Sequence, residues 1–206
     1  MTEDERSPSP EEMLRVIEEQ RAATTKWLSG DPLLIYIPWG VAWLLGFTAL
    51  FLHYGLDGRP YAPISQMQAV GVLLAGLIVA GAVAARGFVW MNRRVRGDTN
   101  ARGAMFGYAW FAGFALMNVI CARMSPQLPP EESGLLWGGC SLMLVAVLYM
   151  AGGAIFLAWP MFFLGVWIAA VNGLGVLLGA GWHALLSAVL LGGGFIAVGV
   201  LARRRS

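Results

Sequence analysis

Few side chains in this 206-residue sequence combine the type and position needed for chemistry. Its long apolar stretches contain no Asp or Glu, and only Arg86, His53 and His183 bring an ionisable side chain near them. Proton relays and many ion-coupled transporters keep an ionisable group at membrane depth, so both are disfavoured. Two histidines without further ligands make a weak metal site. The sequence predicts no catalytic, cofactor-binding or metal-binding residues, and no enzyme.

The remaining reactive groups are expected to be structural. His53 and His183 stand at the ends of apolar stretches and are expected at the membrane interface without a special role. Arg86 precedes Trp90 by about one turn, so its side chain can extend to the lipid headgroups. Cys121 and Cys140 are expected to be buried free thiols, with a disulfide as the alternative. No phosphate-binding loop or nucleic-acid motif is present.

Asn118 and Asn172 are the polar side chains that stand deepest in the apolar stretches. An amide in hydrocarbon seeks a partner on another helix, so the first interpretation is that both hold helices together. The alternative is that they line a substrate path.

The composition identifies the elements that must position these residues. The hydrophobic fraction is 58% and the charged fraction is 13%, whereas a soluble domain carries roughly 25% charged residues. Residues 133–202 contain no Asp, Glu, Lys or Arg, a length sufficient for about three membrane spans of roughly 20 residues. The sequence predicts an all-α membrane protein with six transmembrane helices at about residues 33–54, 66–90, 104–122, 134–157, 160–178 and 182–202.

The charge distribution predicts the orientation and two domains. With the N-terminus inside, the inner segments hold 12 Lys and Arg residues and the outer segments hold only Arg59 and Arg123. We expect the protein in the inner (plasma) membrane of the cell. The positive-inside rule then places both of its termini in the cytoplasm. Residues 1–31 form a cytoplasmic segment with a short amphipathic helix, and residues 32–206 form the transmembrane domain.

The N-terminal helix carries a net charge of −4 over residues 1–31. An acidic helix gains nothing from the negative inner leaflet. We expect it to pack Met13, Ile17 and Trp27 on the inner end of the bundle. Cytoplasmic contacts are expected between its carboxylates and the basic loop, from the set Glu18, Glu19, Arg93, Arg94 and Arg96.

One internal repeat is visible. Residues 40–47 and 107–114 both read Gly-x-Ala-Trp-x-x-Gly-Phe, in the first and third predicted spans. Three helical hairpins related by parallel repetition are one interpretation, and chance convergence in Gly- and Ala-rich helices is the other. In either case Trp43 and Trp110 are expected to face protein.

Several runs carry a resemblance to a family: residues 11–18, 31–34, 38–43, 134–137, 149–153 and 181–183. Over nearly the whole chain they resemble small actinobacterial integral membrane proteins that are often labelled transporters. The resemblance implies the same multi-span fold and transfers no site residues.

Two functions remain open. One is a small transporter or permease-like component for an apolar or amphipathic compound. The other is a non-catalytic membrane partner, such as an assembly, anchoring or sensing subunit. The expected partners of the protein are the lipid bilayer and either a second copy or another membrane protein. A polar cavity at Asn118 or Asn172 would favour transport, and solid packing there would favour the partner.

Overall fold

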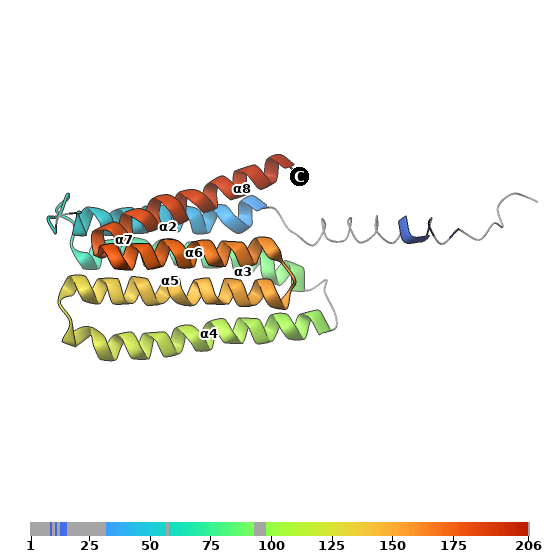
Figure 1. Ribbon diagram of the computed structural model, residues 1–206, viewed down its shortest axis with the longest axis horizontal. Coiled ribbons are helices and arrows are strands. Elements are labelled where there is room, and N and C mark those ends of the chain that lie inside the picture. The colour runs from blue at the N-terminus through green and yellow to red at the C-terminus, as the bar shows by residue number, and fades with distance from the viewer. Residues whose placement is uncertain are drawn as a thin grey trace, which may run out of the picture.

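The computed structural model describes residues 9, 11, 13–15, 32–56, 58–92 and 98–205. Within this part the chain is all α, without strands (Figure 1). Five helices and a short 3-10 turn come first: α2 Pro32–Tyr54, α3 Gln66–Asn92, α4 Asp98–Met124, η2 Ser125–Gln127, α5 Pro130–Ile155 and α6 Trp159–Leu178. The last three segments follow one another end to end and together form a helical rod, called the sixth rod below. They are α7 Ala180–Leu186, the π-helical segment η3 Ser187–Gly193 and α8 Gly194–Arg205.

Six helical stretches are long and apolar enough to cross a membrane, and they confirm the predicted span number. They are Tyr36–Tyr54, Gln66–Arg86, Ala101–Gln127, Pro130–Ile155, Trp159–Leu178 and Ala180–Leu201. Helices suit this setting because every backbone N–H and C=O is satisfied within the segment. The protein is an integral multi-span membrane protein.

The breaks predicted in the charge-free stretch are confirmed. The α5–α6 turn contains Leu157, with a φ of 52°, and Pro160 stands in the first turn of α6. Gly179, with a φ of 97°, separates α6 from α7. Helix α4 begins at Asp98, earlier than the predicted residue 104, because the helix continues beyond its apolar part.

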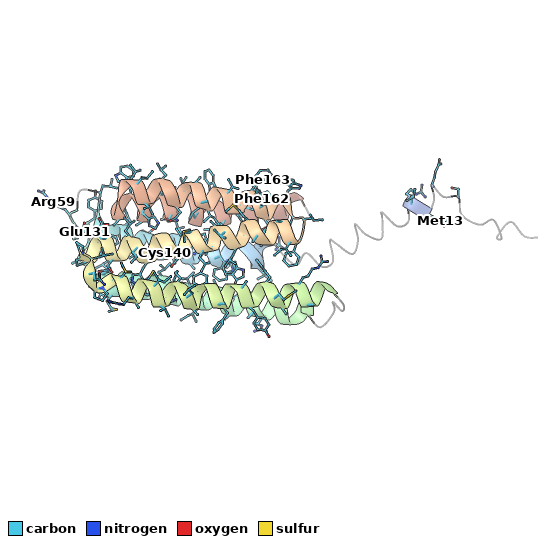
Figure 2. All side chains as sticks on the ribbon, turned by 60° about the horizontal axis from the view of Figure 1, so that its bottom comes forward. Met13, Arg59, Glu131, Cys140, Phe162 and Phe163 are labelled. Atoms are coloured by element: carbon cyan, nitrogen blue, oxygen red, sulfur yellow. The ribbon has the colours of Figure 1, made fainter. Side chains whose placement is uncertain are left out.

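Each helix has a small set of neighbours. Helix α2 packs against α3 on one side and against the sixth rod on the other, the sixth rod packs against α6, and α6 packs closely along α5. Helix α4 packs mainly against α5 and lies at the edge of the bundle (Figure 1). Arg59 and Glu131 mark one end of the bundle, called the Glu131 end below, and Phe162 and Phe163 mark the opposite end (Figure 2).

The core lies where α2, α5, α6 and the sixth rod meet. Trp43 of α2 is buried and its ring lies 5.0 Å from that of Phe195, centroid to centroid. Trp110 of α4 is half-buried and packs on the edge of this core. Both repeated tryptophans thus contact protein, while the three-hairpin repeat itself stays a prediction.

Small residues let the central helices approach closely. A Cβ on Gly192 would lie 2.5 Å from the backbone nitrogen of Leu44, and one on Gly76 would lie 3.0 Å from the Cβ of Ala42. By contrast, a Cβ on Gly103 or Gly107 of α4 would meet no atom within 4 Å. Gly76 therefore packs within the bundle, whereas Gly103 and Gly107 of α4 face outward.

The expected docking of the N-terminal helix stays a prediction. Glu18, Glu19, Arg93, Arg94 and Arg96 all lie outside the described residues.

Candidate functional site

Three polar side chains are buried near the start of the sixth rod. Asn172 of α6 is 7% exposed, His183 of α7 is 4% exposed, and Ser187 at the start of η3 is fully buried. Asn172 stands six residues before Leu178, the last residue of α6. Along the helix axis it is about 9 Å from that end of α6, which lies at the Glu131 end of the bundle. A buried amide and imidazole at this depth need hydrogen-bond partners within the protein.

The amide of Asn172 satisfies that need on both sides. Its Nδ2 donates to the backbone carbonyl of Gly139 in α5, at 2.9 Å. Its Oδ1 lies 2.9 Å from Nε2 of His183. Because Oδ1 is an acceptor, Nε2 carries the hydrogen of this bond, and the neutral ring then has an unprotonated Nδ1. One asparagine thereby joins three of the six spans.

Glycines and an aromatic ring make the space for the imidazole. A Cβ on Gly175 of α6 would lie 2.8 Å from Cα of His183, and one on Gly138 of α5 would lie 2.9 Å from Cε1 of the ring. The ring of Phe47 meets the imidazole edge-on, with centroids 6.0 Å apart. The imidazole is therefore enclosed by α2, α5 and α6.

Ser187 gives the site one unsatisfied group. Its Oγ is buried and has no hydrogen-bond partner. It begins the π-helical segment, a geometry that is frequent at functional sites. The hydroxyl cannot meet a substrate in this conformation because it is fully enclosed. The described residues also contain no group of three His, Cys, Asp or Glu side chains arranged to hold a metal ion.

Packing around the Asn172–His183 pair is dense. Ile168, one turn before Asn172, and Leu191, one turn after Ser187, are both fully buried. Val171 and Leu142 are buried in the same cluster. This arrangement can hold helices in register, because Asn172 bonds to α5 through Gly139 and to the sixth rod through His183.

Asn118, the other deep asparagine, lies apart from this site. It is exposed on α4, and its Nδ2 donates to the carbonyl of Phe114 in the same helix, at 2.8 Å. It borders a shallow apolar hollow of about 440 Å³, with Trp110, Phe111, Phe114 and Ala115. The structure therefore does not bring Asn118 and Asn172 together.

The sequence did not predict the burial of His183. It stands near the end of its span, as predicted, but it is buried against three helices and hydrogen-bonded to Asn172. The signal that sequence reasoning missed is Gly138 and Gly175, the two glycines that leave room for the ring. His53 remains only partly buried, with Nδ1 2.8 Å from the carbonyl oxygen of Ile64.

The two cysteines come from adjacent helices. Cys121 of α4 is buried, Cys140 of α5 is half-buried, and both are free. Figure 2 shows Cys140 within the length of the bundle, between Glu131 and Phe162.

Comparison with known proteins adds no family: no family model, no curated protein and no solved structure matches this chain. The resemblance to actinobacterial membrane proteins stays a prediction.

The two asparagines are expected to differ in their effect on stability. Asn172→Ala leaves the Nε2–H of His183 without an acceptor in a buried site, which costs about 1–3 kcal/mol. Asn118→Ala removes a bond within one exposed helix turn, so the expected loss is smaller, about 0.6 kcal/mol, the average for a side-chain hydrogen bond in a membrane protein. The free energy of unfolding in lipid bicelles measures both. Equal losses in the two variants would show that Asn172 does not join the helices.

Proposed function

We propose that this protein is a non-catalytic membrane partner, a subunit that docks another membrane protein or a second copy through the exposed face of α4. The observation that carries the proposal is the position of Asn118. Its amide stands on an outward-facing side of a membrane span, and its one hydrogen bond among the described residues is to its own helix. An amide in hydrocarbon is stabilised by a partner on another helix.

The surface around Asn118 supports the proposal. Phe111 is 78% exposed and Tyr108 is 73% exposed, so two large aromatic side chains project from α4. Gly107, Phe111 and Asn118 follow one another at spacings of four and seven residues and share one face of the helix. A Cβ on Gly107 would meet nothing within 4 Å, which leaves room for the backbone of an approaching helix.

The packing at Asn172 favours this function over transport. A transporter for an apolar or amphipathic compound would use deep polar groups to line a path between spans. Here the amide of Asn172 is bonded to Gly139 and His183 inside a filled core. Two hollows at the surface of the described bundle, one at α4 and one between α2 and α3, have almost entirely apolar linings.

Photocrosslinking in native membranes tests the proposal. A benzophenone amino acid at Phe111 is expected to give a protein adduct whose mass identifies a second copy or a different subunit. The same amino acid at Ile78, which is equally lipid-exposed on α3, serves as the control and is expected to give none. Asn118→Leu is expected to abolish the Phe111 adduct. A Phe111 probe that reacts only with lipid would overturn the proposal.

We infer further that both termini are cytoplasmic, because 12 of the 14 Lys and Arg residues would then be on the inner side. Single cysteines at Asn100 and Ser206, in a protein without Cys121 and Cys140, are expected to resist a membrane-impermeant thiol reagent added to intact cells. A cysteine at Arg59 is expected to react. Labelling at Asn100 or Ser206 would contradict this orientation.

A further inference from the structure

A groove runs between α2 and α3 on the outside of the bundle. Its volume is about 500 Å³ and its lining is almost entirely apolar. The floor is the close approach of Gly76 to Ala42, where a Cβ on the glycine would lie 3.0 Å from the alanine Cβ. The walls are larger side chains, among them Leu45 on α2 and Val79 on α3, both of which are exposed along the groove.

The length of the groove matches one leaflet. On α3 the lining extends from Val72 to Val83. The eleven steps from Val72 to Val83, at 1.5 Å per residue, span about 16 Å. The hydrocarbon of one leaflet is half of a core roughly 30 Å thick. An extended acyl chain of one leaflet therefore has both the polarity and the length to occupy the groove.

Among the described residues of α2 and α3, Arg86 carries the charge that stands just beyond the groove. Val79, Val83 and Arg86 follow one another at spacings of four and three residues, so they share one face of α3. Arg86 is exposed, about 4.5 Å further along the helix axis than Val83. Neither α2 nor α3 contains an Asp or Glu. The positive charge at the end of the apolar groove is suited to a lipid phosphate, which guanidinium binds bidentately.

We propose that the groove between α2 and α3 binds one anionic phospholipid, with an acyl chain along the groove and the phosphate at Arg86. The apolar lining and length of the groove, and the positive charge beside it, favour a lipid as the occupant. This site is on the face of α2 and α3 and is independent of the α4 surface.

Native mass spectrometry of the full chain tests the site. The protein is equilibrated with an equimolar mixture of phosphatidylglycerol and phosphatidylcholine. The wild type is expected to retain one phosphatidylglycerol in preference to phosphatidylcholine. Arg86→Gln is expected to reduce that preference about fivefold, the effect of one basic residue near an anionic headgroup. Arg59→Gln, at the opposite end of the bundle, is the control and is expected to leave it unchanged.

A second pair of variants tests the groove. Val79→Trp places a bulky ring in the groove and is expected to reduce the bound lipid of both kinds. Ile78→Trp changes the neighbouring exposed residue, which does not line the groove, and is expected to have no effect. The proposal is overturned if Arg86→Gln keeps the preference, if Val79→Trp retains lipid as the wild type does, or if the groove is occupied by a second copy and the spectrum shows lipid-free dimers.

Discussion

The absence of water in the hydrocarbon layer is the constraint on which the structure depends. Each backbone polar group must be satisfied within its own segment, which allows six helices and no exposed irregular spans. A buried amide or imidazole is likewise stabilised by a partner on another helix. Asn172 meets this demand by accepting from His183 and donating to the Gly139 carbonyl, so it joins α5, α6 and the sixth rod where hydrophobic attraction between helices is weak.

The same constraint separates the inside of the bundle from its outside. Inside, glycines bring backbones together and leave room for one imidazole, and the space is filled. Outside, α4 contacts mainly α5 and exposes Asn118, while α2 and α3 leave an apolar groove beside Arg86. Both proposed activities therefore lie on the lipid-facing surface, and the buried pair supplies the rigid frame that positions those surfaces.

Hydropathy predicted the spans well because it reports depth along the membrane normal. Pro160 and Gly179 marked the turns of the charge-free stretch, because their steric effect on the backbone is local and can be read from one sequence alone. Hydropathy carries no information on which way a residue faces around its helix. The burial of His183 and the outward position of Asn118 were therefore not predictable, since each depends on which helices become neighbours.

The filled interior is the central claim, and the accessibility of position 187 to water tests it most directly. Ser187 is fully buried beside the Asn172–His183 pair. A Ser187→Cys variant, in a protein without Cys121 and Cys140, is treated with small water-soluble thiol reagents on both sides of reconstituted membranes. The structure predicts no reaction from either side, while an Arg59→Cys control reacts. Rapid labelling of position 187 would reveal a water-filled path through the bundle and contradict the account.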